Sequence, residues 1–203
     1  MKRWKMIALA GSLAAAAGPL AAADFSDPTW PCIQRKVEGL GVGLMWPHPI
    51  EETALAVDTQ AAVDTLVSRL TLRRLPVEDV APDVAAFVQA HGSGAALLGQ
   101  VFEATFDRLA GTRTRIIRGI EDYSLSQIAL SNRIGAARAE MDAIMATDEP
   151  DFDRVDALEE QVDWDERIYD DRRRSLTYVC ETPVLLEKRL YAIAQLLSAR
   201  IEG

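Results

Sequence analysis

The sequence predicts an all-α protein: a helical base, which is a bundle of about four helices, bears a long projecting antiparallel coiled-coil hairpin and is preceded by an extended N-terminal strap. Three observations predict this architecture. Apolar residues recur every three or four positions along two long stretches toward the C-terminus. One polar turn with a proline separates the two stretches. Prolines and glycines are concentrated in residues 24–49, where they disfavour a helix.

Residues 1–23 have the three parts of a secretory signal peptide. Cationic side chains near the start precede an uncharged stretch at 6–17, and alanines occupy positions 21–23. Small residues there favour cleavage between Ala23 and Asp24, and the apolar run is too short to span a bilayer. We therefore expect a periplasmic or secreted protein with no transmembrane span after signal cleavage.

The charge and the cysteine content exclude several classes of protein. The chain has 203 residues, with 22 Lys and Arg against 31 Asp and Glu, and a formal net charge of −9. A nucleic-acid partner is not expected, because phosphate neutralisation requires a basic face. Two cysteines are too few for a zinc cage or a disulfide-dense scaffold. In an oxidising compartment we expect Cys32 and Cys180 to form one disulfide.

Residues 24–49 are expected to form an extended strap that lies on the helical body. They contain four prolines, three glycines and the dipeptide Trp-Pro twice, at Trp30 and Trp46. We interpret the two indoles as anchors of the strap. Apolar residues alternate with glycine and methionine over 42–46, which predicts a short extended piece there.

Residues 50–110 are expected to form the first part of the helical base. Apolar residues at helical spacing predict a helix over 50–75, which a proline ends. A second helix is expected over 82–91, where glycines follow it. Residues 183–203 complete the base as a new helix that begins at Pro183 and returns from the hairpin.

Residues 111–182 are expected to form the hairpin, with its turn at 147–151. A long 3.5-residue apolar repeat is typical of a left-handed coiled coil, and a short turn makes two helices antiparallel neighbours. The repeat of the first arm consists of Phe102, Phe106, Leu109, Arg113, Ile116, Ile120, Tyr123, Gln127, Leu130, Ile134, Ala137, Met141 and Ile144. The repeat of the second arm consists of Val155, Leu158, Val162, Asp165, Tyr169, Arg172, Leu176, Val179, Pro183, Leu186, Leu190, Ile193 and Leu197.

When the two arms are folded on each other about the turn, each repeat position of the first arm lies opposite a repeat position of the second. One offset holds for all the pairs, so the arms share one register. This register puts Gln127 opposite Arg172, a polar layer that we expect to set the register at a cost in stability. Alternatively, both side chains extend past the seam to the surface. The same register places Asp165 within reach of Arg133.

The register also predicts where the strap crosses the hairpin. Cys180 lies opposite Gly119, and a glycine costs about 1 kcal/mol in a helix interior. We expect Trp30 and Pro31 to pack over the space at Gly119 while Cys32 bonds to Cys180.

Two groups of side chains have the chemistry of metal ligands, although no cofactor is expected. An acidic group at the turn lacks the central glycine and last glutamate of an EF-hand, and a helix N-terminus attracts acids in any case. Cys32, Met45 and His48 resemble the ligands of a soft copper site, but a disulfide would consume Cys32. The acidic group consists of Asp148, Glu149, Asp151 and Asp153.

The sequence contains no constellation typical of an enzyme. Its two histidines, His48 and His91, belong to no recognisable triad, zinc or di-iron motif. We therefore expect a non-enzymatic exported helical protein that acts through protein–protein contacts of the hairpin, as a scaffold, adaptor or chaperone-like factor. The pattern does not identify the protein partner and is compatible with self-association. The alternative is a periplasmic metal- or small-ligand-binding protein that uses the acidic turn or the strap with Cys32 and His48.

Overall fold

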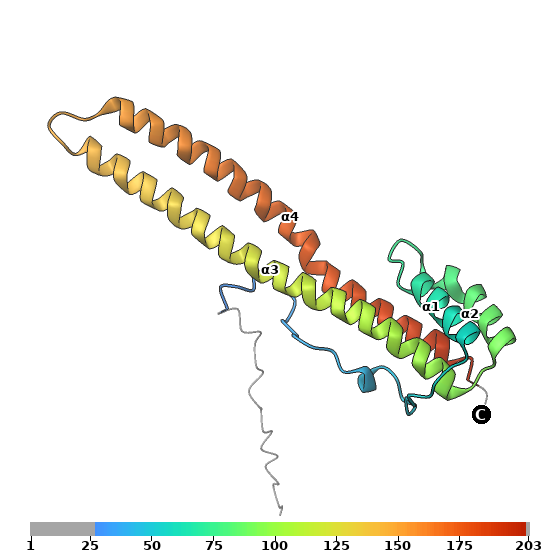
Figure 1. Ribbon diagram of the computed structural model, residues 1–203. Coiled ribbons are helices and arrows are strands. Elements are labelled where there is room, and N and C mark those ends of the chain that lie inside the picture. Colours follow the sequence, from blue (N-terminus) through green and yellow to red (C-terminus); the bar gives the residue numbers. More distant parts are fainter. Residues whose placement is uncertain (1–26, 202–203) are drawn as a thin grey trace, which may run out of the picture.

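The computed structural model describes residues 27–201 and shows four α-helices and no strand in that range (Figure 1). The helices are α1 (Val57–Leu70), α2 (Val77–His91), α3 (Ala95–Met145) and α4 (Phe152–Ser198). The all-α class predicted from the apolar periodicity is therefore confirmed. The expected signal peptide, residues 1–23, lies outside the described residues. Within the described range, no helix has an apolar run of the length that a bilayer crossing requires.

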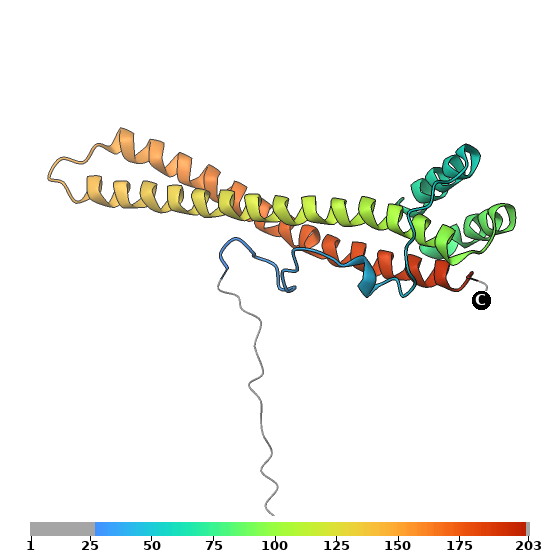
Figure 2. The same ribbon diagram turned by 60° about the horizontal axis from the view of Figure 1, so that its bottom comes forward.

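Helices α3 and α4 pack antiparallel and form the predicted hairpin (Figure 1). Residues 146–151 connect them at the far end, and α4 crosses α3 on the way back to the base (Figure 2). The Asp151 carboxylate accepts a hydrogen bond from the backbone N–H of Arg154 at 3.0 Å and so caps α4. Every position of the two predicted repeats is buried or half-buried except Val179. The repeat therefore selects the buried face correctly.

All four helices contribute to one apolar core at the base. Trp46 of the strap joins this core and stacks on Phe102 of α3, with ring centroids 5.0 Å apart. The guanidinium of Arg189 on α4 donates to the carbonyls of Leu70 and Leu75 at 2.9 and 2.6 Å. These bonds attach the connection between α1 and α2 to the hairpin.

Helix α1 begins later than predicted, at Val57 instead of residue 50. The side-chain amide of Gln100 on α3 donates to the carbonyls of Glu51 and Thr53 at 2.9 and 3.0 Å. In a helix these two carbonyls would accept hydrogen bonds from backbone N–H groups four residues later. Here Gln100 supplies the donors instead, so the stretch needs no helix to satisfy them.

Two prolines lie inside helices where the sequence predicts helix starts. Helix α2 begins at Val77 and contains Pro82, and α4 runs through Pro183 without interruption. The Thr182 hydroxyl, one residue before Pro183, donates to the Tyr178 carbonyl at 3.3 Å within α4. A proline removes one backbone donor, but tertiary packing of the apolar face supplies most of a helix's stability. The prediction of a new helix at Pro183 is therefore wrong.

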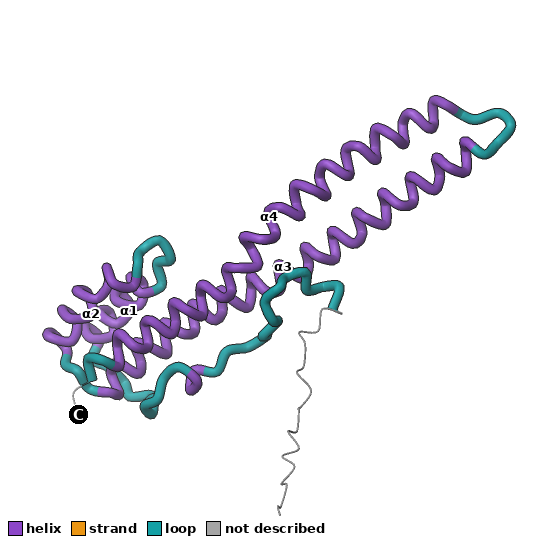
Figure 3. The backbone as a smooth tube through the Cα atoms, turned by 180° about the vertical axis from the view of Figure 1, so that it is seen from behind, coloured by secondary structure: helices purple, strands orange, loops and turns teal. Residues whose placement is uncertain are grey.

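The strap runs along one face of the hairpin from the base to its middle, while α1 and α2 lie on the opposite face (Figures 2 and 3). A 3-10 turn, η1 (Val42–Leu44), replaces the short extended piece predicted there. The backbone N–H groups of Met45 and Trp46 both donate to the Val42 carbonyl at 3.0 Å. This turn accompanies the burial of the Trp46 indole in the base core.

Candidate functional site

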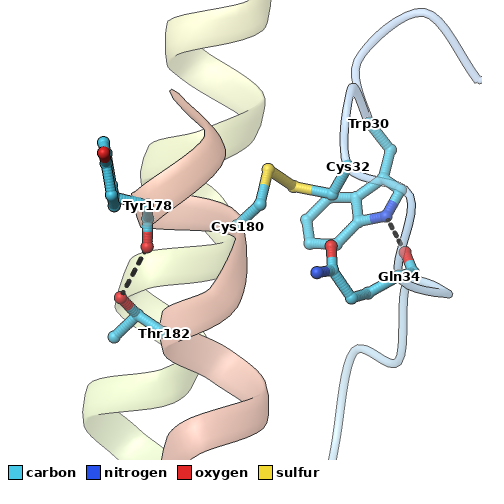
Figure 4. Close-up of a disulfide and its surroundings, with 6 residues drawn as sticks. All are labelled: Trp30, Cys32, Gln34, Tyr178, Cys180 and Thr182. Carbon is cyan, nitrogen blue, oxygen red and sulfur yellow. Dashed lines mark hydrogen bonds between the residues drawn. A yellow bond between two sulfur atoms is a disulfide. The ribbon is translucent and has the colours of Figure 1, made fainter. Parts of the chain in front are cut away.

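A disulfide between Cys32 and Cys180 bonds the strap to the middle of α4 (Figure 4). The two Cα atoms are 5.5 Å apart, and both side chains are buried together with Ile120 of α3. The indole N–H of Trp30 donates to the Gln34 carbonyl at 2.6 Å and closes the strap around the bonded cysteine. The disulfide predicted from export and from the cysteine number is therefore confirmed.

The strap does not pack over Gly119, contrary to the prediction. A Cβ atom added at Gly119 would meet nothing within 4 Å. The Ser124 hydroxyl of α3 instead donates to the Pro28 carbonyl at 2.8 Å, which places the strap on the Ser124 side of the seam. Gly119 and Cys180 belong to the same level of the hairpin but border opposite sides of its seam. A register read as layers does not distinguish these two sides.

On the side away from the strap, Gly119 borders a small apolar pocket between α3 and α4. Its volume is about 140 Å³. The residues that line it are Gly119, Ile120, Tyr123, Ser175, Leu176 and Val179. The glycine therefore leaves a hollow at the surface of the hairpin and makes no room for the strap.

Ion pairs hold the strap on α3. The Lys36 ammonium pairs with the Glu121 carboxylate of α3 and lies 3.6 Å from the Asp27 carboxylate. The hydrogen bond to Glu121 raises the pKa of Lys36 above its ordinary value. Hydrogen bonds from the hydroxyl and the backbone N–H of Thr29 lower the pKa of Asp27.

Three segments of the chain meet at Arg113. Arg113 is only 2% exposed, as its position in the predicted repeat implies, although its side chain is charged. Its Nε and Nη2 atoms each lie 2.7 Å from the Glu187 carboxylate of α4, and Nη1 donates to the Glu38 carbonyl of the strap at 3.5 Å. A buried guanidinium requires such partners, because an unpaired charge loses its hydration without compensation. Arg113 thus connects α3, α4 and the strap.

Gln127 and Arg172 have different partners within the same stretch of the hairpin. The side-chain amide of Gln127 donates to the Tyr169 carbonyl at 3.1 Å, and its buried oxygen has no hydrogen-bond partner among residues 27–201. The guanidinium carbon of Arg172 lies 5.9 Å from the centre of the Tyr123 ring, in cation–π geometry. The role of Gln127 and Arg172 in setting the register stays a prediction.

The contact predicted between Asp165 and Arg133 is confirmed. Both carboxylate oxygens of the buried Asp165 accept hydrogen bonds from Arg133, the one from Nε at 2.6 Å. Such a two-point contact restricts how far one helix of the hairpin can shift along the other. Asp165 and Arg133 therefore have the geometry of a register-setting pair, the role that the sequence assigns to Gln127 and Arg172.

The hairpin tip combines exposed apolar and acidic side chains. Met145 ends α3, Phe152 begins α4, and both side chains are exposed. The four acids considered as metal ligands in the alternative interpretation lie in and beside the turn, where Asp151 serves as the cap of α4. In the part of the chain that the structure describes, no three His, Cys, Asp or Glu side chains form a metal-ligand group. Cys32 is oxidised in the disulfide and is no thiolate ligand for the copper alternative.

The chain matches no protein-family model, no curated protein and no solved structure. The functional argument therefore depends on the geometry of this molecule. Its distinctive features are a strap that is covalently bonded to one face of a hairpin, and exposed apolar side chains on the hairpin itself.

Proposed function

We propose that the protein is an exported, non-enzymatic scaffold, adaptor or chaperone-like factor that binds a protein partner with the tip of its hairpin. The signal-like sequence of residues 1–23 supports export. The Cys32–Cys180 disulfide also supports export, because such bonds persist in oxidising compartments and are rare in the cytosol.

The exposure of Met145 and Phe152 carries the proposal. Met145 ends α3 and Phe152 begins α4, and these helix ends lie at the far end of the hairpin, remote from the base (Figure 1). A separate apolar cluster, which includes Leu158 and Val162, supports the tip-side half of the hairpin. Burying a large apolar side chain contributes about 1.5–3 kcal/mol, so a partner that covers both residues gains substantial free energy.

The charge around the tip specifies the chemistry of the partner. Four acids lie in or beside the turn: Asp148, Glu149, Asp151 and Asp153. The nearest basic side chain, Arg154, pairs with Glu140 at 2.7 Å, which reduces its effect on the field. An apolar pocket with a rim of lysine and arginine complements such a surface, because opposite charges steer association and suppress wrong partners.

Site-specific photo-crosslinking in the producing cells tests the proposal. We expect a crosslinking amino acid at position 152 to capture one defined protein. Position 57 is the control, because Val57 is also exposed but lies at the start of α1 in the base. Capture of nothing at position 152, or of the same set of proteins at both positions, would contradict the proposal.

A second variant separates binding from folding. Replacing Met145 and Phe152 with serine should abolish capture by a crosslinker at position 149 and leave the unfolding transition unchanged, because both side chains are exposed. Export is tested by sequencing the N-terminus of the purified protein. We expect it to begin at Asp24, and a protein that retains residues 1–23 would contradict export by cleavage.

A further inference from the structure

Helix α4 carries a second row of residues at seven-residue spacing, on its outer face. Every member lies away from the seam with α3, because the seam uses other positions of the repeat. Three large side chains in the row are strongly exposed: Trp164 is 61%, Tyr178 is 77% and Leu185 is 54% exposed. The full row consists of Ala157, Trp164, Asp171, Tyr178, Leu185 and Ala192.

Within residues 27–201, no other part of the protein covers these three side chains. A helix needs an apolar stripe toward each helix that it packs on, and the contacts of α4 with α3 and with the base core use other positions of α4. Tryptophan and tyrosine are also the residues that most often dominate the energy of protein interfaces. A spacing of seven residues keeps the row on one face of α4, where a neighbouring helix can run along it.

A row of charged residues runs beside the apolar row, on the outermost positions of α4. It consists of Glu160, Arg167, Arg174, Glu181 and Lys188, and all five are exposed. Within the described chain, only Arg174 makes an ion pair, with Asp171 at 3.8 Å. The other four charges have no such partner in residues 27–201 and are available to another molecule.

The charged row is complementary to itself when it is reversed. If two copies of α4 lie antiparallel about Arg174, Glu160 faces Lys188 of the second copy and Arg167 faces Glu181 of the second copy. The two-fold axis repeats both pairs, so four attractive contacts form. Only Arg174 faces its own counterpart, and the adjacent Asp171 of each copy compensates that charge. We propose that a second copy of this chain packs antiparallel on the outer face of α4.

The apolar row fits the same arrangement. Antiparallel alignment places Trp164 beside Leu185 of the second copy, and Tyr178 beside Asp171 of the second copy, where the phenol can donate to the carboxylate. The charged row pairs best with the two-fold axis at residue 174, and this row with the axis midway between residues 174 and 175. The two positions differ by half a residue, which is less than about 1.5 Å along the helix. Both rows therefore make their contacts in one complex.

Charge also decides the orientation of the second copy. In a parallel pair in register, each residue of the charged row would face its own counterpart, so all five contacts would be repulsive. The tip residues Met145 and Phe152 lie outside α4's outer row, so this interface and the proposed tip interface are separate surfaces. Failure of one proposal leaves the other unaffected.

Charge reversal tests the interface, with sedimentation of the disulfide-bonded protein as the measurement. We expect a dimer whose dissociation constant rises about tenfold or more in Arg167→Glu and in Glu181→Arg, because each change sets like charges opposite each other twice. The double variant Arg167→Glu/Glu181→Arg restores opposite charges and should return the constant to within about threefold of the original. A monomer at all concentrations, or a double variant that stays as weak as the single variants, would overturn the proposal.

The apolar row has its own test. Trp164→Ser should raise the dissociation constant by about tenfold to a hundredfold, as loss of an interface tryptophan does. Leu44→Ser is the matched control, since Leu44 is exposed in the strap and lies outside the row. Circular dichroism checks that both variants keep their helices. Equal effects of Trp164→Ser and Leu44→Ser would overturn the assignment of this face.

A short bis-maleimide tests the antiparallel orientation, because it reacts with free thiols and leaves the Cys32–Cys180 disulfide intact. Arg174→Cys lies at the proposed axis and should give a covalent dimer. Glu160→Cys places the two thiols about 40 Å apart in an antiparallel pair and should not crosslink. Crosslinking of Glu160→Cys at the same rate as Arg174→Cys would show a parallel pair and overturn the proposal.

Discussion

Arg113 of α3 and Glu187 of α4 form an ion pair inside the hairpin seam, with Nη2 and Oε1 2.7 Å apart. The same guanidinium donates to the Glu38 carbonyl, so the pair also holds the strap. Glu187 is partly exposed, whereas Arg113 is buried. Water can hydrate the Glu187 carboxylate, whereas the buried Arg113 charge is compensated mainly by Glu187.

Removing one member of this pair should destabilise the protein more than removing both. We expect Glu187→Met to lower the free energy of unfolding by about 2–3 kcal/mol, because the buried Arg113 guanidinium loses the carboxylate that compensates its charge. The double variant Arg113→Met/Glu187→Met should recover part of that loss. Urea unfolding measures both variants, and a double variant less stable than Glu187→Met would contradict this view of the pair.

Loss of the disulfide should release the strap and leave the hairpin helical. Cys32 and Cys180 are 148 positions apart, for which the chain-entropy model gives a maximum of about 5 kcal/mol. Reduction should lower the melting temperature and open residues 39–43 to proteases. Cys32→Ser and Cys180→Ser should melt alike and be insensitive to reductant. Identical melting of the oxidised and reduced proteins would refute a stabilising bridge.

Replacing the seam residues Gln127 and Arg172 with leucine tests the polar layer. Gln127→Leu should raise the free energy of unfolding by about 1 kcal/mol, because removing a buried oxygen that has no partner in residues 27–201 outweighs the lost hydrogen bond to the Tyr169 carbonyl. Arg172→Leu should be nearly neutral, since it loses only the contact with Tyr123. The double variant should gain stability and lose uniqueness of register, measured as broader distances between spin labels on the two arms. A clear destabilisation by Gln127→Leu would contradict the prediction.

Gly119→Ala should stabilise the hairpin by about 0.5–1 kcal/mol. The new methyl group meets no other atom within 4 Å, and alanine restricts the unfolded chain. Gly99→Ala is the matched comparison: its Cβ would lie 3.5 Å from Nε1 of Trp46, an ordinary van der Waals contact, so it should not destabilise the protein either. Thermal unfolding of the two variants decides, and destabilisation by Gly119→Ala would show that the fold needs the hollow.

Acid should weaken the outer end of the strap through Asp27. Its folded-state pKa lies below the ordinary value of 3.8 because Thr29 donates two hydrogen bonds to it. A lowered pKa stabilises the folded state above about pH 3.8, and this contribution disappears as the pH falls through the folded-state value. The melting temperature should therefore fall more steeply below about pH 4 in the original protein than in Asp27→Asn. Asp148→Asn at the turn is the control, and equal slopes in all three proteins would contradict the prediction.

Much of the hairpin follows from the linear pattern alone. Two apolar repeats and one polar turn predict two long antiparallel helices, because a seam of 3.5-residue period is satisfied only by a neighbouring helix. The pairing of Cys32 with Cys180 follows from arithmetic, since no third cysteine competes. The contact of Asp165 with Arg133 follows from the register. Each of these is a local rule or a one-dimensional alignment.

Other features depend on contacts between segments that are distant in the sequence. Helix α1 starts at Val57 because Gln100, far along the chain, binds the preceding backbone. Pro183 stays inside α4 because packing on α3 outweighs one lost donor. The strap lies on the Ser124 side of the seam, where the Ser124 hydroxyl binds the Pro28 carbonyl. The layer register could not predict this side, because it does not distinguish the two sides of a seam. Local pattern determines which residues are buried, whereas the choice of neighbour for each buried face is decided by the free energy of the whole packed molecule.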